Sequence, residues 1–427
     1  MDLSELIYGY GQTVPTARGD RQYVNLDNAA STPPFKQVIQ AICNEAAWYS
    51  SIHRGAGYKS RYMTEKYENS RKIVADFVGA DPDHDVVIFT KNTTDSLNKL
   101  SHYLQFLPGE WVVHTALEHH SNELPWAKYS NFAVGLDGSG INLGEAENFL
   151  KRHSGQVKLV AVSGASNVTG HTPSIYTLAE LAHAAGAKIA VDGAQLVPHR
   201  PVNMYPPSDP RHLDFLAFSA HKMYAPFGVG VLIGPRALFQ RTPPSQVGGG
   251  TVKGIGSAGI IWSDPPEVEE AGSPNVLGVT ALTEAIQVLS SIGWQSLIEQ
   301  ETKLIEYTIE HLRQIPGITV INPENKDRVG VISFDVAGFH HEKVASYLAD
   351  EWGIGVRSGC FCARKYVRLL LNLNSNQLQT AIQGVVSNHP ESVPGLVRVS
   401  FGCYNQLWEA ELLCQSLAEL LRLKPQQ

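Results

Sequence analysis

The sequence predicts an α/β protein with a large, mostly parallel sheet and a smaller α+β domain. From Val86 to Ser219, short apolar runs alternate with helix-like segments, which is typical of parallel strands covered by helices on both faces. The chain has 427 residues, more than one hydrophobic core usually accommodates, and its pattern changes after about residue 295. We therefore expect a large domain over residues 22–295 and a small domain formed by residues 1–21 and 296–427.

The expected elements of the large domain follow one another as strand, polar loop and helix. A short strand at Tyr23–Asp27 leads into a turn, and the pair Pro33-Pro34 opens a helix that runs to Ala46. The expected strands of the main sheet are Val86–Phe89, Trp111–Val113, Leu159–Val162, Ile189–Val191, Phe215–Phe218 and Gly228–Gly234. The expected helices beside them are Ser96–Leu104, Tyr176–Ala185 and Val276–Ile292.

The small domain is expected to begin with a helix over Leu297–Ile315. Three strands should follow, at Gly330–Phe334, Ile354–Val356 and Val397–Phe401. The segment Lys365–Pro394 is longer and more polar than a tight connection needs, so we expect it to form a lid or a separate lobe.

The composition of the chain indicates its cellular compartment and argues against some classes of binding partner. The net charge of -7, with 43% hydrophobic and 18% charged residues, is that of an ordinary soluble protein and argues against nucleic acid as a partner. The N-terminus lacks the pattern of a signal peptide, and no apolar run reaches the length of a membrane span. Five cysteines in so long a chain fit a reducing compartment better than a disulfide scaffold. We expect a cytoplasmic protein that binds neither nucleic acid nor a membrane.

Two polar residues at strand ends indicate a cofactor. Asp192 and Lys222 each follow an apolar strand, and ligands bind at the carboxyl ends of strands in open α/β sheets. A lysine that binds an aldehyde covalently and an aspartate that keeps a pyridine nitrogen protonated together suit pyridoxal 5'-phosphate (PLP). Either residue alone is more often a helix cap or a solvated loop residue. The pair, with Gln195 and His221 beside it, favours the cofactor site.

Three other strand ends carry residues that suit the same cofactor. Thr93 and Thr94 follow a strand and open a helix, where N–H groups and hydroxyls bind phosphate, although a plain N-cap has the same pattern. His119 could stack on a pyridine ring and shuttle protons, although histidines at such positions are as often surface residues. Asn167 could donate a hydrogen bond to the phenolic oxygen of PLP.

The C-terminal region adds a thiol and a guanidinium group. Cys360 and Cys362 lie near Arg357 on an expected loop, and a cysteine beside positive charge can be a thiolate nucleophile. A Cys-x-Cys pair can also bind metal, but no second pair accompanies it, so no metal site is expected. Arg398 lies on an expected strand and has the planar fork that suits an amino-acid carboxylate; the alternative is a surface ion pair.

Ten short motifs, in order along the chain, resemble those of the cysteine desulfurases and selenocysteine lyases, in the SufS-like branch of the class V aminotransferase fold. They are Leu26–Ala30, His53–Gly55, Asn92–Thr94, Glu118–Asn122, Ser166–Gly170, Asp192–Gln195, Ser219–Lys222, Gly272–Asn275, Arg357–Gly359 with Cys362, and Arg398–Phe401. Each motif is weak alone, but the ordered set spans nearly the whole chain. The resemblance implies the fold of a PLP-dependent transferase, the aspartate aminotransferase-like fold type I.

The resemblance also implies roles for the matching residues around the cofactor ring. Lys222 would hold the cofactor covalently and later move the Cα proton of the substrate. Asp192 would pair with the pyridine nitrogen, and His119 would stack on the ring. Gln195 and Asn167 would bind the phenolic oxygen.

Phosphate, substrate and sulfur contacts are implied in the same way. The phosphate would be bound by Thr93, Thr94, Ser219 and His221, joined in a homodimer by Ser273 of the partner subunit. The substrate would be bound by Arg398 at its carboxylate with help from Asn28, and also by Arg357 and His53. Cys362 would be the nucleophile that takes the sulfur as a persulfide.

The implied activity is the conversion of L-cysteine to L-alanine, with the sulfur left on Cys362 for an acceptor protein. Two departures from the family leave alternatives open. Cys360-Phe361 replaces the usual His-His pair and resembles the desulfurase-like domain of molybdenum-cofactor sulfurases, and the connection from Cys362 to Arg398 is longer than usual. The alternatives are a lyase acting on L-selenocysteine, another C–S lyase or an epimerase of the same fold, a molybdenum-cofactor-sulfurase-like activity, and a non-catalytic PLP-binding or sulfur-relay protein.

Overall fold

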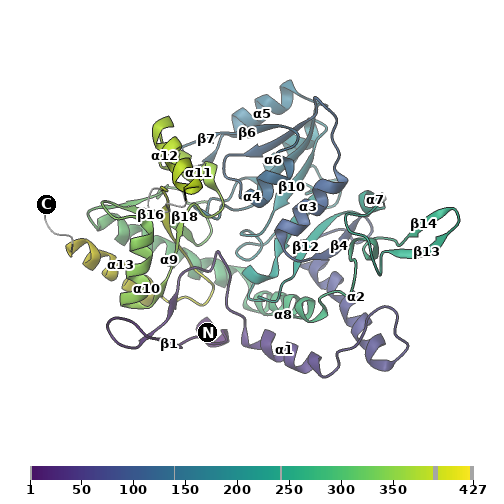
Figure 1. Cartoon of the computed structure of the whole chain (residues 1–427), viewed down its shortest axis with the longest axis horizontal. Coiled ribbons are helices and arrows are strands. Elements are labelled where there is room, and N and C mark those ends of the chain that lie inside the picture. Colours follow the sequence, from purple (N-terminus) through teal and green to yellow (C-terminus); the bar gives the residue numbers. More distant parts are fainter. Residues whose placement is uncertain (1, 139, 241–242, 388–392, 424–427) are drawn as a thin grey trace.

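The computed structural model describes residues 2–138, 140–240, 243–387 and 393–423. A seven-stranded sheet with its helices forms the larger part, and a four-stranded sheet with its helices forms the smaller part beside it (Figure 1). The α/β architecture with a large and a small part is the one expected from the sequence. Among the described residues no single helix could span a membrane by length and composition, and only a pair of helices bent by 82° passes that test jointly.

The large sheet is parallel except for one strand. Its order is β4 (Asp85–Thr90), β12 (Gly230–Pro235), β11 (Phe215–Ser219), β10 (Lys188–Asp192), β9 (Val157–Ser163), β5 (Trp111–Thr115) and β6 (Ser130–Val134). β12 is antiparallel to both of its neighbours, and the other pairs are parallel. This confirms a large, mostly parallel sheet. Because every parallel strand points the same way, their carboxyl ends share one edge.

Successive side chains of these strands enter two different cores. In β10, Ile189 and Val191 pack with α2 (Tyr58–Val78), α6 (Ile175–Ala184) and α8 (Val276–Ile292) on one face. Ala190 packs with α3 (Thr93–Tyr103) on the other face. Neighbouring side chains of a strand point to opposite faces of a sheet, so strands covered on both sides are apolar throughout. This is why the sequence shows apolar runs and not an alternating pattern. The remaining helices of this part are α1 (Lys36–Ala46), α4 (His120–Glu123), α5 (Leu143–Arg152) and α7 (Arg236–Phe239).

The small part is an antiparallel sheet covered by helices. The strand order is β15 (Ile318–Val320), β16 (Val331–Val336), β19 (Leu396–Ser400) and β18 (Arg357–Gly359). The helices α9 (Trp294–Gln314), α10 (His341–Trp352) and α13 (Leu407–Arg422) pack on it. The short elements elsewhere are η1 (Leu3–Leu6), β1 (Thr13–Val14), β2 (Arg21–Gln22), η2 (Leu124–Trp126), β7 (Leu136–Asp137), β8 (Gly140–Ile141), η3 (Ala220–Lys222), β13 (Val252–Gly256), β14 (Gly259–Trp262) and η4 (Glu267–Glu269).

The N-terminal segment contributes to both cores. Leu3 and Ile7 pack in the larger cluster, whereas Val24 and Leu26 pack in the smaller one. β3 (Val24–Asn25) also pairs with β17 (Ile354–Gly355) of the small part. The packing therefore crosses residue 22, and the expected domain boundaries at residues 22 and 296 stay a prediction.

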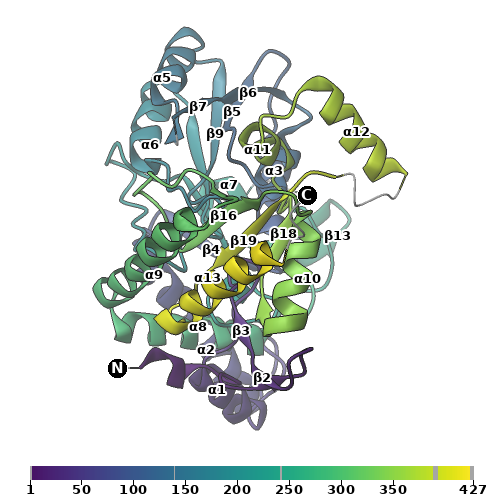
Figure 2. The same cartoon turned by 90° about the vertical axis from the view of Figure 1, so that its left-hand side faces the viewer.

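Two helices that the sequence pattern did not indicate occupy most of the segment Lys365–Pro394, the first of them beginning one residue before it. They are α11 (Arg364–Leu370) and α12 (Ser375–Val386), and residues 388–392 lie outside the described residues. α12 begins with a capping box in which Asn374 and Gln377 bond each other's backbone N–H groups. Figure 2 shows α12 projecting from the body of the molecule. Its role as a lid remains a prediction.

Candidate active site

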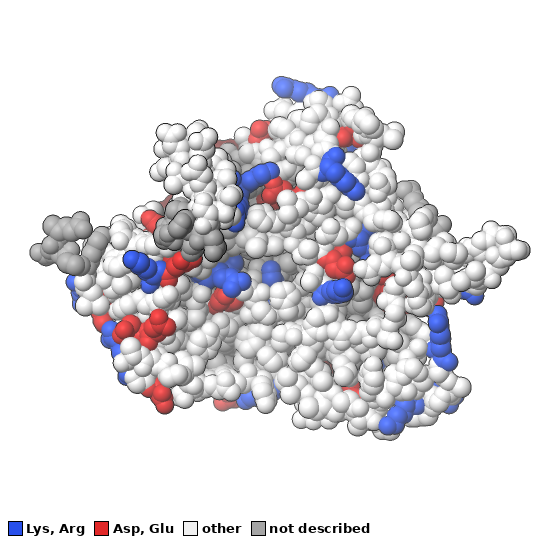
Figure 3. All heavy atoms as spheres, in the orientation of Figure 1, with Lys and Arg blue, Asp and Glu red and all other residues white. Residues whose placement is uncertain are grey.

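Five parallel strands of the large sheet end at one edge, and the residues that follow them line one cavity. The cavity has a volume of about 640 Å³, and residues of β18 and β19 close its other side. Figure 3 shows a hollow near the middle of one face, with Lys and Arg atoms beside it. The predicted site residues in the cavity lining are Thr93, Thr94, His119, Asn167, Asp192, Gln195, Ser219, His221, Lys222, Arg357, Cys362 and Arg398.

Lys222 and Asp192 lie at the ends of neighbouring strands. Lys222 ends η3, directly after β11, and Asp192 ends β10. Loss of water contact lowers the pKa of Lys222 to about 8, although the carboxylate of Asp192 opposes this. Burial raises the pKa of Asp192 to about 6, opposed by the N–H of Ala194, which donates to Oδ1 at 3.0 Å. An amine with this pKa is partly unprotonated near neutral pH, as covalent attachment to an aldehyde requires.

Unused polar atoms in this cavity fit PLP. Among the described residues, Asp192 accepts a hydrogen bond only from Ala194, which leaves a buried carboxylate oxygen open for a protonated ring nitrogen. Gln195 donates through Nε2 to the carbonyl of Ala29 at 2.7 Å, but its buried Oε1 has no hydrogen-bond partner. Buried polar atoms are rarely left unpaired, so this one is consistent with a missing polar ligand. The residues present therefore fit the cofactor expected from the sequence.

The start of α3 forms an anion cradle. Asn92 caps the helix by accepting from the N–H of Asp95 at 3.0 Å. The N–H of Thr93 donates to the hydroxyl of Ser219 at 2.8 Å, and the two hydroxyls lie 2.7 Å apart. A Cβ at Gly230 would lie 2.5 Å from the backbone of Asn92, so this glycine lets the helix start approach the sheet. Hydroxyls at a helix N-terminus suit a phosphate group.

Two further predicted phosphate residues line the same cavity. The hydroxyl of Thr94 lies 2.7 Å from that of Ser121. Loss of water contact and, to a smaller extent, the charge of Lys222 lower the pKa of His221 to about 4. His221 is therefore a neutral hydrogen-bonding group at pH 7.

His119 is held in one tautomer. Its Nδ1 accepts from the N–H of Ser121 at 3.1 Å, at the start of α4, so the ring proton of the neutral imidazole is on Nε2. Loss of water contact lowers the pKa of His119 to about 4, with contributions from the charges of Lys222 and Arg398. A neutral ring that lines the cavity is suited to stacking on a flat heterocycle.

Glu118 supports this position, and sequence reasoning gave it no role. Its buried carboxylate accepts from the hydroxyl of Thr115 at 2.6 Å, from the amide of Asn122 at 2.7 Å, and from the hydroxyl and N–H of Ser163 at 2.7 and 3.1 Å. These bonds join the ends of β5 and β9 through the residue that precedes His119 in the chain. An acidic residue three positions after the end of a buried strand was the available signal.

Arg398 is paired with a carboxylate of the chain itself. This arginine on β19 is 3% exposed and donates to Asp27 at 2.7 Å and to the carbonyl of Asn167 at 3.0 Å, whereas its buried Nε has no partner. Burial lowers the pKa of Arg398, and Asp27 opposes the shift. Arg357 lies 3.7 Å from the other oxygen of Asp27. The sequence motif contained Asp27, but nothing in it indicated that Asp27 pairs with Arg398.

Cys362 lies in a tight turn at the edge of the cavity. Phe361 and Cys362 have φ angles of 51° and 56°, in the left-handed region that side chains usually avoid. The side chain of Phe361 is buried, and the guanidinium of Arg398 lies 5.0 Å from its ring. Cys362 is exposed, and Cys360 is half-buried and lines the same cavity.

Three predicted residues lie outside the cavity lining. Asn28 is buried, donates to Ser400 and Asn405, and accepts from Tyr404. His53 and Ser273 line a second cavity of about 280 Å³.

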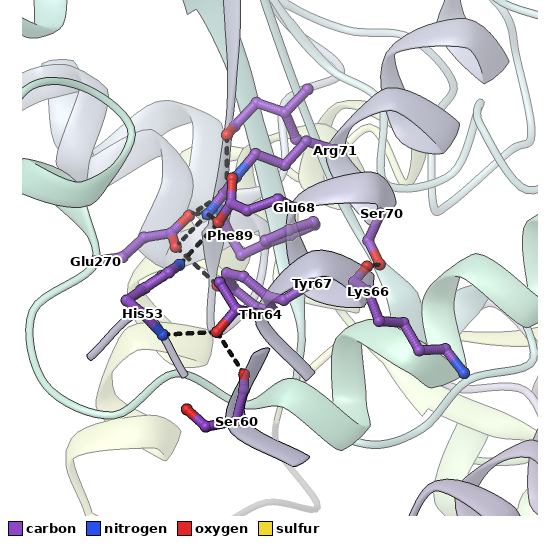
Figure 4. Close-up of polar contacts among 11 residues, drawn as sticks. His53, Ser60, Thr64, Lys66, Tyr67, Glu68, Ser70, Arg71, Phe89 and Glu270 are labelled. Carbon is purple, nitrogen blue, oxygen red and sulfur yellow. Dashed lines mark hydrogen bonds and ion pairs between the residues drawn. The ribbon is translucent and has the colours of Figure 1, made fainter. Parts of the chain in front are cut away.

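Around His53, a polar cluster surrounds Arg71 and Glu270 (Figure 4). His53 bonds Glu68 at 2.9 Å there, and its N–H donates to Thr64 at 2.8 Å. The single chain therefore brings twelve of the predicted residues together and holds His53 and Ser273 elsewhere.

Comparison with known proteins identifies the family. The aminotransferase class-V family model matches residues 24–413. A probable cysteine desulfurase of Pyrococcus abyssi is 36% identical over 414 residues, covering 94% of this chain and 95% of the relative. A cysteine desulfurase of Escherichia coli strain SE11 is 33% identical, covering 93% of each chain.

Solved structures agree with this result. The apo structure of a cysteine desulfurase from Thermococcus onnurineus NA1 has a TM-score of 0.82 at 34% identity, covering 94% of this chain and 95% of that one. The cysteine desulfurase CsdA of Escherichia coli has a TM-score of 0.79 at 27% identity, with the same coverage. The chain is thus a member of the class V aminotransferase family, a family of PLP enzymes, and is related over nearly its whole length to cysteine desulfurases.

Proposed function

We propose that this chain is a PLP-dependent cysteine desulfurase that converts L-cysteine to L-alanine and keeps the sulfur as a persulfide on Cys362. The observation that carries the proposal is the cavity itself, because Lys222, Asp192, Arg398 and Cys362 come from distant parts of the chain and all line it. A lysine and an aspartate alone would fit many reactions of this family. The thiol in the same cavity favours sulfur removal.

The residues that would hold PLP line the cavity and have polar atoms free to bind a ligand. Lys222 would bind its aldehyde carbon, Asp192 its ring nitrogen, and the hydroxyls at the start of α3 its phosphate. When bound, PLP withdraws electrons from the Cα atom of the attached amino acid. Asp192 supports this withdrawal because its buried carboxylate favours a protonated ring nitrogen.

Proton movement is assigned to Lys222. Its amine, with a pKa of about 8, is able both to accept the Cα proton and to return a proton to form alanine. His119 keeps its proton on Nε2 and is neutral, so it would cover the ring without adding charge. The thiolate of Cys362 would attack the substrate sulfur, and an S–S bond would form as the Cβ–S bond breaks. The electron pair of the broken bond would stay on the carbon side, where a proton completes the methyl group of alanine, and the sulfur would remain on Cys362 as a persulfide.

Arg398 would bind the substrate carboxylate. Its buried Nε lacks a hydrogen-bond partner, and Nη2 of the guanidinium donates to Asp27. A substrate carboxylate would take the place of Asp27 or bind beside it, and bidentate binding would fix the orientation of Cα. This follows from the chemistry of the free donor and from the match of Arg398 to the family motif.

We also propose a homodimer, a protein sulfur acceptor and a cytoplasmic location. Ser273 and His53 line a cavity away from Lys222, so a partner subunit would be needed to bring Ser273 to a phosphate. The exposure of Cys362 supports transfer of sulfur to another molecule. The expectation of a cytoplasmic protein rests on the sparse cysteines.

The test is alanine production by matched cysteine variants. Cys362→Ala should abolish alanine formation from L-cysteine while keeping the absorption band of the bound cofactor. Cys360→Ala should retain alanine formation. Full turnover by Cys362→Ala would refute the persulfide mechanism, and a chain that stays colourless with added PLP would refute the cofactor assignment. Assays with L-selenocysteine, and of pyruvate as a product, distinguish the alternative lyases.

A further inference from the structure

Cys360 and Cys362 belong to the same turn. The N–H of Ala363 donates to the carbonyl of Cys360 at 2.8 Å, which closes the turn around Phe361 and Cys362. Both central residues have left-handed φ angles. With helix-like backbone of either hand, Cα atoms two positions apart lie about 5.5 Å from each other. Disulfides span Cα separations of about 4.4–6.8 Å, so the backbone permits a bond between these two cysteines.

This turn is hydrogen-bonded to the larger part of the molecule. Asn167 donates to the carbonyl of Phe361 at 2.7 Å, and the N–H of His120 donates to the carbonyl of Cys362 at 2.8 Å. The Phe361 side chain is 8% exposed and packs beneath Arg398. These contacts hold Cys362 beside Cys360 and oppose movement of the turn as a free arm.

Cys360 is the only other thiol at the cavity. All five cysteines lie within the described part of the chain, and of these only Cys360 and Cys362 line the cavity. Cys43 is exposed on α1, Cys403 has its N–H bonded to Tyr224, and Cys414 is buried in the core of the small part. Cys360 is therefore the thiol of this chain best placed to meet a persulfide on Cys362.

We propose that Cys360 is a resolving thiol that releases the sulfur of the Cys362 persulfide as hydrosulfide. The proposal rests on the proposed desulfurase function, because the persulfide is its starting point. The Cys360 thiol loses its proton to solvent and attacks the Sγ atom of Cys362. A bond forms between the two Sγ atoms, the bond from Cys362 Sγ to the terminal sulfur breaks, and hydrosulfide leaves with the electron pair.

The electron balance requires a reductant. The two cysteines are oxidised together by two electrons, and the terminal sulfur is reduced to the oxidation state of sulfide. A dithiol reductant, small molecule or protein, must then return the pair to two thiols before the next turnover. Sulfur would thus leave this enzyme as sulfide at the expense of a dithiol, in addition to any direct transfer from Cys362.

The test follows the sulfur in the PLP-loaded, full-length protein. One equivalent of L-cysteine per subunit is added with no other thiol present, so that no free cysteine is left to act as a reductant. Free thiols are then blocked with an alkylating reagent, and the mass of the peptide containing residues 360–362 is measured by mass spectrometry. The wild-type peptide should lack two hydrogen atoms and carry no alkyl group, with one sulfide released per subunit. Cys360→Ala should instead keep an extra, alkylated sulfur on Cys362 and release no sulfide. Cys43→Ala, which removes an exposed thiol outside the cavity, should behave as the wild type.

A second measurement does not depend on turnover. Oxidised glutathione, added to the resting protein, should form the bond between Cys360 and Cys362 in the wild type and in Cys43→Ala, detected as a peptide of residues 360–362 that lacks two hydrogen atoms and carries no glutathione. Absence of that bond would overturn the proposal. So would equal sulfide release by wild type and Cys360→Ala with persulfide retained in both. Failure of both to form alanine would overturn the desulfurase function instead, and the glutathione measurement would still decide whether the pair closes.

Discussion

The buried ion pair between Arg71 and Glu270 allows a sharp test of how the second cavity is held together. The two side chains are 11% and 5% exposed and form two parallel bonds of 2.7 and 2.8 Å (Figure 4). Glu270 also accepts from the N–H of Phe89 and the hydroxyl of Tyr67, both at 2.7 Å. Glu270 lies three residues before Ser273, so this pair fixes the segment that carries Ser273.

Glu270→Gln keeps the shape of the side chain and removes its charge. Among the described residues, Arg71 would then keep only the more exposed Glu68 as an ionic partner, at 3.0 Å. The new amide group would face the N–H donors that now bond Glu270. Breaking a buried ion pair by removing one partner costs about 3–5 kcal/mol, and the remaining amide oxygen places this variant near the lower end. With a urea m-value of about 3 kcal/mol/M, the unfolding midpoint should fall by roughly 1 M.

Glu68→Gln is the matched control, because Glu68 contacts the same arginine with a side chain that is 42% exposed. Exposed pairs contribute about 0–1 kcal/mol, so its midpoint should move by no more than roughly 0.3 M. The assay is urea unfolding followed by far-UV circular dichroism, at one fixed cofactor loading. Replacing both charges, with Arg71→Met and Glu270→Leu, should recover part of the loss. Equal shifts for Glu270→Gln and Glu68→Gln would show that burial does not control this pair.

Two other predictions concern the substrate and pH. Arg398→Lys removes the planar fork and at least one charge-assisted bond of about 1.5–3 kcal/mol, so the KM for L-cysteine should rise about 10- to 150-fold. Binding of cysteamine, which lacks the carboxylate, should change little when followed by cofactor absorbance, and an equal change for both ligands would contradict the role of Arg398. His183 donates to Asp214 and to the carbonyl of Pro210, both at 2.9 Å, and the bond to Asp214 raises the pKa of His183. Because the folded pKa is raised, its stabilisation is complete below the unfolded pKa near 6.5 and is lost as pH rises through the folded value. The difference in Tm between wild type and His183→Gln should therefore be larger at pH 6 than at pH 9, and a constant difference would refute the ionic role.

The sequence predicted the main sheet well because its strands are buried on both faces. Short apolar runs that alternate with helices, such as Ile189–Val191 and Phe215–Phe218, are typical of such buried parallel strands. Both runs are strands in the structure. The helix α12 was not foreseen, because it leaves Ile382, Val385 and Val386 exposed and contains no charged residue to mark a polar face.

The position of a site residue was predictable where the residue directly follows a strand of the large sheet. Asp192 and Lys222 each follow a strand directly, so their meeting at the sheet edge follows from topology. The pairing of Asp27 with Arg398 joins residues 371 positions apart and depends on how the two parts dock. Ser273 could not be placed either, because its expected contact lies in a partner subunit.

The bond between Arg398 and Asp27 affects which anions can bind to Arg398. A carboxylate tethered beside the guanidinium acts as a built-in competitor, with an effective concentration on the order of millimolar or above. Inorganic anions and simple carboxylic acids, held by this contact alone, must exceed that concentration before they occupy the arginine. The carboxylate of an amino acid that is attached to the cofactor through its nitrogen would also be tethered. Its effective concentration at Arg398 would then be comparable with that of Asp27. If Arg398 binds the substrate carboxylate as proposed, the internal ion pair would favour acids that are already attached to the protein at a second point.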